Sequence, residues 1–253
     1  MCSFVLKEKQ KMIIAIDVGN TRIKVAVYDR NTWGGFYHIA TKDFRSQIEN
    51  ITEKLPEKPF IIISSVGKLN EYQLKWLATK GFLHIVSAND KLPFENKYAT
   101  PHTLGADRIA LAAGLALEFP KRNKLVIDCG TCITYDFVNQ RNEYLGGAIS
   151  PGLNLRYKSL NDYTAKLPLL SISDEYPLTG TSTNQSIHSG VINGAVAEID
   201  GFINEYKTRY DNLTVILTGG DAIFLAESIK NNIFVRSNFL IESLVLYYQY
   251  INS

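Results

Sequence analysis

The sequence contains few cysteines and no long apolar run. Cysteine occurs at three of its 253 positions, Cys2, Cys129 and Cys132. Three are too few for a disulfide framework, and a chain of this length can bury a core without one. No apolar stretch approaches the roughly 18 residues that a membrane-spanning helix needs. We therefore expect a soluble, cytoplasmic protein without structural disulfides.

An excess of charge of one sign is also missing. The chain has 27 Lys and Arg against 25 Asp and Glu, a net charge of +2, so its charge does not indicate a nucleic acid or a membrane surface as partner. Any bound anion must be held by a local site. With 45% hydrophobic residues, 21% charged residues and 8 prolines, the composition is that of a globular protein with one large domain or two of about 120 residues.

The first eleven residues (1–11, MCSFVLKEKQK) differ in character from the rest of the chain. They contain too few apolar residues for the core of a signal peptide, and charged residues crowd their end. We expect a disordered extension, with Met12 as the working start of the protein.

A short pattern of strand, turn and strand occurs twice. In the first copy Ile13–Asp17 predicts a buried strand and Ile23–Tyr28 a second strand, with a glycine turn between them. In the second copy Leu125–Asp128 and Ile133–Val138 take the same places. Each copy ends its first strand on an aspartate, so the chain looks internally duplicated. A duplicated fold commonly has its site at the junction of the copies.

Further strands and helices follow each copy. In the first half we expect strands at 60–64 and 83–86 and helices at 69–79 and 106–117; in the second, strands at 215–218 and 233–236 and helices at 185–206, 222–229 and 240–250. We therefore expect each half to fold as an α/β unit, a mixed sheet with flanking helices. We place the boundary at 118–122, which gives domains 12–118 and 119–253 with a cleft between them.

The first glycine turn carries groups suited to a phosphate chain. Asp17, Gly19, Asn20, Thr21 and Lys24 occur within eight residues. Glycine lets backbone N–H groups approach an anion, Asn and Thr add neutral donors, and Lys adds a positive charge. The aspartate would repel phosphate unless a divalent cation or water stands between them. The pattern indicates a site for metal-bound polyphosphate, although taken alone an ordinary hairpin turn explains it at least as well.

The second glycine turn repeats a carboxylate, a glycine and a hydroxyl group as Asp128, Gly130 and Thr131. Two such turns facing each other can hold a phosphate chain from both sides. Cys129 and Cys132 resemble a redox or zinc pair, but a zinc site needs four ligands, the four histidines show no ligand spacing, and a strand rather than a helix follows. We interpret both cysteines as packing residues.

A third glycine turn joins a buried strand to a helix at 218–222. Its adjacent glycines, Gly219 and Gly220, permit close approach of a flat group such as adenine or ribose, and the helix N-terminus offers free N–H groups. A plain turn between a strand and a helix explains the pair equally well.

Asp107 and Arg108 open an apolar helix directly after Gly105. An aspartate there stabilises the first helical turn through the macrodipole, which is one sufficient explanation. The alternative is a carboxylate aimed into a site by a rigid helix, with Arg108 offering a planar donor pair to a carboxylate substrate. The macrodipole would keep Asp107 ionised and hence a weak base, which phosphoryl transfer tolerates.

These motifs together resemble the type III pantothenate kinases, a family of the acetate and sugar kinase, Hsp70 and actin superfamily. The resemblance runs from Met12 to the last helix. Its carriers are DVGNTRIK at 17–24, GADR at 105–108, DCGT at 128–131, GGAISPG at 146–152, GTST at 180–183 and TGGD at 218–221. GADR followed by DCGT and GGAISPG is the part specific to the family. The resemblance implies two duplicated ribonuclease H-like (actin-like ATPase) domains with the active site in the cleft between them.

The resemblance also implies an activity, the ATP-dependent phosphorylation of pantothenate to 4′-phosphopantothenate, the first step of coenzyme A synthesis. Transfer would be direct and in line, with Mg²⁺ and a monovalent cation, K⁺ or NH₄⁺. Asp107 would accept the proton, Asp128 would bind the monovalent cation, and Asp17 would bind Mg²⁺ through water or the nucleotide. The implied binding residues are, for ATP, Asp17, Val18, Gly19, Asn20, Thr21, Arg22, Ile23, Lys24, Thr131, Gly219 and Gly220, and, for pantothenate, Tyr98, Gly105, Ala106, Asp107, Arg108 and Thr183.

The chain departs from the family pattern at two positions. Thr100 stands where the family often has Asn before a proline, and Cys132 replaces a small apolar residue. Tyr98 also has a simpler interpretation as a half-buried loop aromatic, and Thr183 as a helix N-cap. The resemblance further implies a homodimer with its substrate site near the subunit interface.

Two other functions stay open on the sequence alone. One is a sugar or acetate kinase of the same superfamily, for which the chain has no spare segment that could form a sugar-binding insert. The other is a non-catalytic, nucleotide-binding regulator. The presence of Asp17, Asp107 and Asp128 together argues against the regulator, because a protein without chemistry has no use for a base.

Overall fold

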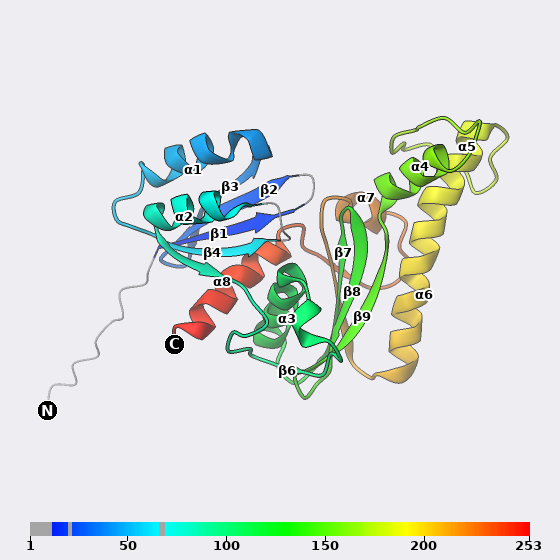
Figure 1. Cartoon of the computed structure of the whole chain (residues 1–253). Helices are drawn as coiled ribbons and strands as arrows, with labels where there is room; N and C mark the ends of the chain where they lie inside the picture. Colours follow the sequence, from blue (N-terminus) through cyan, green and yellow to red (C-terminus); the bar gives the residue numbers. More distant parts are fainter. Residues whose placement is uncertain (1–11, 20–21, 66–68) are drawn as a thin grey trace, which may run out of the picture.

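The computed structural model describes residues 12–19, 22–65 and 69–253. The expected extension 1–11 and two predicted phosphate-binding residues, Asn20 and Thr21, lie outside the described residues. Figure 1 shows the course of the chain.

The described chain forms two sheets and the helices that cover them. The strands are β1 (Ile13–Val18), β2 (Ile23–Asp29), β3 (Thr32–Ile39), β4 (Phe60–Ser65), β5 (Phe82–Ile85), β6 (Glu95–Asn96), β7 (Asn123–Cys129), β8 (Cys132–Val138), β9 (Glu143–Pro151), β10 (Leu213–Thr218) and β11 (Phe234–Val235). The α-helices are α1 (Phe44–Thr52), α2 (Glu71–Lys80), α3 (Ala106–Glu118), α4 (Leu153–Asp162), α5 (Thr183–His188), α6 (Gly194–Arg209), α7 (Ala222–Ala226) and α8 (Phe239–Ile251).

The two sheets share one strand arrangement. The first has the order β3-β2-β1-β4-β5, with β1 antiparallel to β2, β2 antiparallel to β3, and β4 and β5 parallel to β1. The second has the order β11-β10-β7-β8-β9-β6, in which β7, β8 and β9 are antiparallel neighbours and β10 and β11 run parallel to β7. β7 to β11 therefore repeat the order and directions of β1 to β5.

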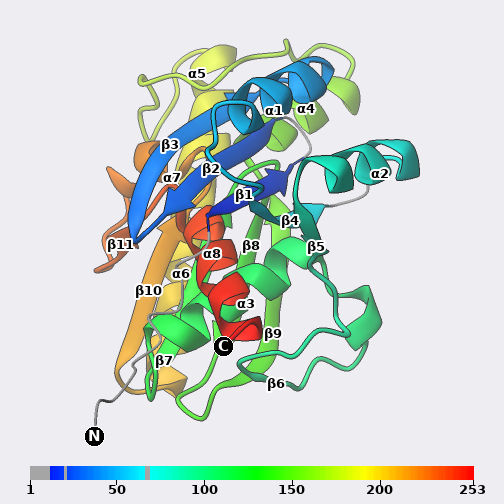
Figure 2. The same ribbon diagram turned by 90° about the vertical axis from the view of Figure 1, so that its left-hand side faces the viewer.

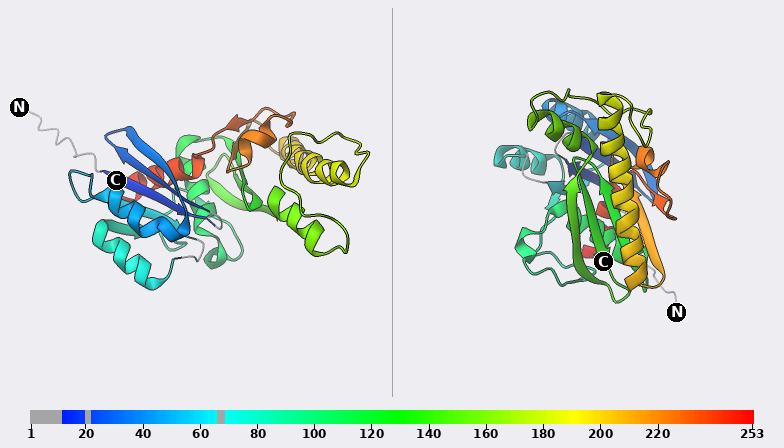
Figure 3. Two further views of the ribbon diagram at one scale, coloured as in Figure 1. Left: turned by 90° about the horizontal axis from the view of Figure 1, so that it is seen from above. Right: turned by 90° about the vertical axis from the view of Figure 1, so that its right-hand side faces the viewer.

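The sheets and helices alternate in layers (Figure 1). α1 and α2 cover the outer face of the first sheet, where Ile14 and Ile16 of β1 pack with Ile48 of α1. α3 and α8 lie between the two sheets and share one core with the inner faces of both. α6 covers the outer face of the second sheet, in front of it in the right-hand view of Figure 3.

α3 and α8 cross at close range between the sheets, as Figure 2 shows. A Cβ atom added at Gly114 of α3 would lie 2.0 Å from the hydroxyl oxygen of Ser243 on α8. Glycine is needed at this position because the helices approach so closely. α8, the last helix, packs on β1, β2 and β4. The last helix of the chain therefore lies against the sheet that contains its first strand.

Most of the predicted strands and helices are present, including the paired strands of both copies, β1 with β2 and β7 with β8. Two predictions were wrong in extent. The helix expected over 185–206 is divided by a π-helical segment at Ser189–Asn193, where Gly190 and the following Gly194 lower helix propensity. α7 ends at Ala226 instead of residue 229. No described helix is long and apolar enough to cross a membrane.

Candidate active site

Two aspartates, the buried Asp17 and the half-buried Asp128, lie at equivalent strand ends. Asp17 is the next-to-last residue of β1 and Asp128 the next-to-last residue of β7. Burial and, to a smaller extent, the charge of Asp128 raise the pKa of Asp17 from 3.8 to about 7. Burial likewise raises the pKa of Asp128 to about 6. Because the charge of Asp128 acts on Asp17, the ends of β1 and β7 lie near each other in space.

Lys24 supplies positive charge to both aspartates. It lies opposite Asp17 in the register of β1 and β2, and its charge lowers the pKa values of Asp17 and Asp128. Its Nζ atom donates a hydrogen bond of 3.4 Å to the backbone oxygen of Ser237, which precedes α8. This lysine therefore links the first sheet to the segment that leads into the last helix.

The third aspartate comes from a helix. Asp107 is the second residue of α3 and is half-buried. Its Oδ1 atom accepts a hydrogen bond of 2.8 Å from the backbone N–H of Arg108. Its charge raises the pKa values of Asp17 and Asp128, so the three carboxylates form one electrostatic cluster from three elements. Gly105 makes room for it, since a Cβ atom there would lie 2.4 Å from Oδ1 of Asp107.

The third glycine turn packs directly against Asp128. Gly219 has a φ of +98°, and a Cβ atom on it would lie 2.4 Å from Oδ1 of Asp128. The backbone N–H of Asp221 donates a hydrogen bond of 3.0 Å to the oxygen of Cys129. Gly220, in contrast, is exposed and a Cβ atom on it would meet nothing within 4 Å. The second and third turns thus pack directly against each other.

The turn between β7 and β8 leaves Thr131 exposed, three residues after Asp128. The N–H of Gly152 holds this turn by donating a 3.0 Å hydrogen bond to the backbone oxygen of Thr131.

Cys129 is buried, and burial raises the pKa of its thiol well above the usual range, so it is no nucleophile at neutral pH. Both Cys129 and Cys132 are free thiols. The interpretation of Cys129 as a packing residue is confirmed.

The predicted substrate residues Tyr98 and Arg108 lie together. The guanidinium carbon of Arg108 is 5.7 Å from the centroid of the Tyr98 ring, and the Tyr98 ring lies against Gly146, which has a φ of +100°. The structure adds two residues that the sequence pattern did not indicate. Arg108 Nε donates a 2.8 Å hydrogen bond to Asp136 of β8, and Asp136 also accepts one of 2.6 Å from the hydroxyl group of Tyr144.

Thr183 lies far from the other predicted substrate residues of the same chain. It is the exposed first residue of α5, and Figures 1 and 2 show α5 well apart from α3. The interpretation of Thr183 as the N-cap was wrong by one position. The cap is Ser182, whose hydroxyl group accepts a 3.3 Å hydrogen bond from the N–H of Gln185.

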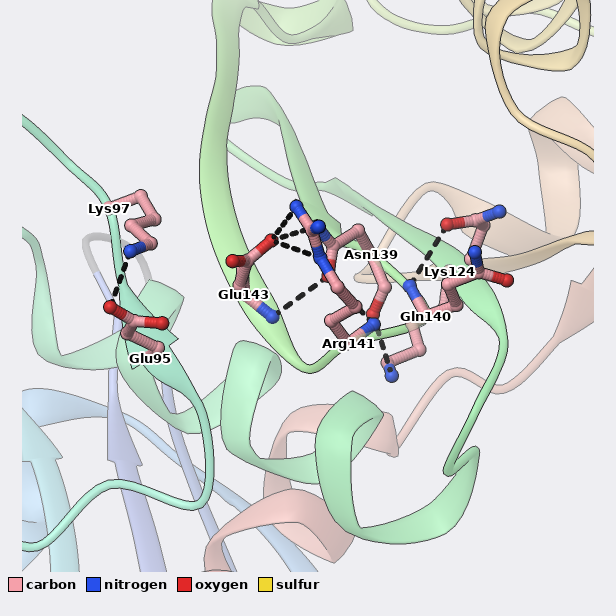
Figure 4. Close-up of polar contacts among 8 residues, drawn as sticks. Glu95, Lys97, Lys124, Asn139, Gln140, Arg141 and Glu143 are labelled. Carbon is pink, nitrogen blue, oxygen red and sulfur yellow. Dashed lines mark hydrogen bonds and ion pairs between the residues drawn. The ribbon is translucent and has the colours of Figure 1, made fainter.

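A second polar cluster lies at the other end of the second sheet and has a structural role (Figure 4). It surrounds the turn between β8 and β9, where Glu143 accepts hydrogen bonds from Asn139 and Arg141. The fully buried Lys124 donates a 3.2 Å hydrogen bond to the oxygen of Asn139, and burial lowers its pKa to about 8. The paired groups of this cluster hold a hairpin, whereas the acids of the candidate site raise one another's pKa values.

Comparison with known proteins agrees with the motifs. The family model described as type III pantothenate kinase matches residues 13–205. The chain is 52% identical over 239 residues to the type III pantothenate kinase of Flavobacterium johnsoniae, an alignment that covers 94% of this chain and 98% of that protein.

Solved structures with lower identity show the fold. A Campylobacter jejuni protein named for the Baf family of transcriptional activators is 21% identical, with a TM-score of 0.59 over 95% of this chain and 100% of that one. A glucokinase from an Antarctic psychrotroph is 12% identical, with a TM-score of 0.53 over 96% of this chain and 99% of that one. The fold is therefore the mixed α/β fold of actin-like proteins and sugar kinases.

Proposed function

The chain belongs to the type III pantothenate kinase family, and on that premise we propose that it transfers the terminal phosphoryl group of ATP to the primary hydroxyl group of pantothenate, the first step of coenzyme A synthesis. The observation that carries the mechanism is the convergence of Asp17, Asp107 and Asp128 from β1, α3 and β7 on one site. Carboxylates whose pKa values are raised by desolvation and by one another's charge are typical of functional sites, because a stable fold alone does not require them.

Asp107 is the base in this mechanism. It is half-buried in the first turn of α3, so it can contact a bound alcohol. A weak base suffices because the transition state of phosphoryl transfer is loose: the carboxylate orients the hydroxyl group and takes its proton late. Arg108, the next residue, pairs with the carboxylate of pantothenate.

ATP lies between the two halves in our proposal. Residues 17–24, with Gly19 and Lys24, hold the phosphates from the first sheet; Thr131 contacts them from the second, and Gly219 and Gly220 lie against the adenosine. The repeated strand order supports two duplicated ribonuclease H-like domains, 12–118 and 119–253, with the site in a cleft between them.

The acids fit the cations that the family resemblance implies. Asp17 and Asp128 present oxygen ligands, which Mg²⁺ and K⁺ prefer, and their raised pKa values mean that a nearby positive charge would favour their ionised forms. Among the described residues no group of three or more His, Cys, Asp or Glu could hold a metal by itself. Phosphate oxygens and water must therefore complete the coordination. Bound Mg²⁺ would neutralise charge on the transferred group, with Asp17 near Mg²⁺ and Asp128 near the monovalent cation.

We further propose a homodimer that brings Thr183 to the substrate site of the partner. Support comes from large apolar side chains that are exposed in the single chain on β9, on α4 and in the segment up to α5, a pattern typical of interfaces. They are Leu145, Ile149, Leu155, Tyr163, Leu169 and Leu178. Light scattering coupled to size exclusion tests this proposal, which a monomeric mass at micromolar concentration would contradict.

A steady-state assay tests the proposed function. The purified chain is incubated with ATP, Mg²⁺ and K⁺ and a panel of acceptors that includes pantothenate, acetate and several sugars, while ADP release is recorded. We expect release that depends on pantothenate and is stimulated by K⁺. Preferential phosphorylation of a sugar or acetate would assign the chain to another kinase class, and nucleotide binding without turnover would favour a regulator.

A further inference from the structure

Asp136 is a buried carboxylate that the proposed mechanism does not use. It lies in the middle of β8, is fully buried, and faces the core between the sheets. One of its oxygens, Oδ1, accepts both the 2.8 Å hydrogen bond from Nε of Arg108 and the 2.6 Å hydrogen bond from the hydroxyl group of Tyr144. The other oxygen, Oδ2, is buried without a hydrogen-bond partner among the described residues.

A pair of this kind is an expensive way to stabilise a core. Desolvation of two charges commonly outweighs their attraction, and apolar side chains of similar size often replace such a pair without loss of stability. Burial raises the pKa of Asp136 to about 6 even though the positive charge of Arg108 acts in the opposite direction. Stability alone therefore does not account for this pair.

The contacts of the pair restrict the orientation of the Arg108 side chain. A guanidinium group is planar and offers two edges for binding a carboxylate. Asp136 occupies the nitrogen Nε, and the ring of Tyr98 lies beside the guanidinium carbon at 5.7 Å. Arg108 is only 7% exposed, and its guanidinium is also hydrogen-bonded to the side chain of Tyr98. These contacts fix the plane of the guanidinium, and the edge formed by Nη1 and Nη2 is the one that Asp136 does not occupy.

We propose that Asp136 is a positioning residue, which holds Arg108 by Nε so that the Nη1 and Nη2 edge meets the carboxylate of pantothenate. Tyr144 completes the arrangement by donating to the same carboxylate oxygen from β9. The proposal rests on the proposed function, because it assigns the determinant of substrate specificity in that site. Asp136 itself touches no substrate, and its effect passes through Arg108.

The substitution Asp136→Asn tests this assignment. It keeps an acceptor oxygen for Arg108 but removes the charge that fixes the guanidinium. We expect the KM for pantothenate to rise on the order of tenfold to a hundredfold, the effect of misplacing a binding group, with kcat and the KM for ATP nearly unchanged. Pantothenol, in which a hydroxymethyl group replaces the carboxylate, serves as a second ligand, tested as substrate and as competitor. Its binding should change little, because it lacks the group that Arg108 pairs with.

Two tyrosine variants make the test independent of how well Asp136→Asn folds. Tyr144→Phe removes one hydrogen bond to Asp136 and should raise the KM for pantothenate in the same direction, by less. Tyr135→Phe is the matched control: Tyr135 precedes Asp136 in β8, is equally buried, and donates a 2.9 Å hydrogen bond to Glu198 on the other face of the sheet. It should leave the KM for pantothenate unchanged.

The outcomes separate the two proposals. Equal KM values for pantothenate in Tyr144→Phe and Tyr135→Phe would overturn the role of Asp136, as would equal losses for pantothenate and pantothenol in Asp136→Asn. Absence of pantothenate-dependent ADP release from the wild-type chain would instead defeat the proposed function.

Discussion

The ionised side chain of Asp17 lowers the free energy of unfolding of the ligand-free protein, and this effect can be measured. The side chain is 8% exposed, and burial together with the charge of Asp128 raises its pKa from 3.8 to about 7. The unfolded chain has the ordinary value. Between these two pKa values the folded state binds more protons than the unfolded state, so stability falls as the pH rises through this window.

The size of the effect follows from the shift. At about 1.4 kcal/mol per pH unit, ionised Asp17 destabilises the folded state by about 4 kcal/mol above pH 7. Asp17→Asn removes the charge but leaves a buried amide, whose incomplete hydrogen bonding costs about 1–3 kcal/mol. We therefore expect the variant to be more stable than the wild type by about 1–3 kcal/mol at pH 8, a rise in Tm of about 2–4 °C for each kcal/mol.

Thermal unfolding checks this expectation. Wild type and Asp17→Asn are compared at pH 8 and at pH 5, with a chelator and without nucleotide, and the gain should be clearly larger at pH 8. Asp174→Asn makes the same charge change at an exposed position and should shift stability by less than about 0.5 kcal/mol. The reasoning is refuted if Asp17→Asn is the less stable protein at pH 8, or if its gain is as large at pH 5.

Three further predictions concern the site and its support. Asp107→Asn should lower turnover by at least about a hundredfold, the contribution of a general base, while calorimetric titration still shows ATP binding; unchanged turnover would remove Asp107 from the mechanism. Gly219→Ala should destabilise the protein by about 1–3 kcal/mol, because the φ of Gly219 is +98° and the added Cβ atom would lie 2.4 Å from a carboxylate oxygen of Asp128. Gly220→Ala is the control and should not destabilise it, because a Cβ atom there would meet nothing within 4 Å. Equal denaturation midpoints for the two variants would contradict this prediction. Gly114→Ala should lower the free energy of unfolding by about 1–3 kcal/mol, because the added methyl group would overpack the crossing of α3 and α8. Gly201→Ala, on the open face of α6, should raise it by about 1 kcal/mol through helix propensity. A Gly114→Ala variant more stable than the wild type would show that the two helices can separate.

Some strands escaped prediction because glycine interrupts their pattern. β3 (TWGGFYHI) and β9 (EYLGGAISP) each contain a glycine pair, which lowers strand propensity and breaks the alternation of apolar and polar residues. They form because neighbouring strands pair with them: β2 with β3, and β8 with β9. Strand pairing is a tertiary interaction, so local sequence carries little of it.

The role of Asp136 escaped prediction for a related reason. A charged residue inside the apolar strand ITYDFV was a visible signal. Its meaning depends on Arg108, which lies 28 positions earlier in the chain and on another element. Tyr144 reaches the same oxygen from the next strand only because β8 and β9 pair in their particular register.

Local pattern was enough to locate β1, β2, β7 and β8, the glycine turns after β7 and β10 and the start of α3, because strands, turns and helix ends depend mainly on residues adjacent in the chain. It was also enough to name Asp17, Asp107 and Asp128 as candidates. That these three acids act on one another, and that burial raises the pKa values of two of them, follows from the packing of α3 between two sheets. Desolvation and Coulomb energies depend on distances in space, which only the folded chain defines.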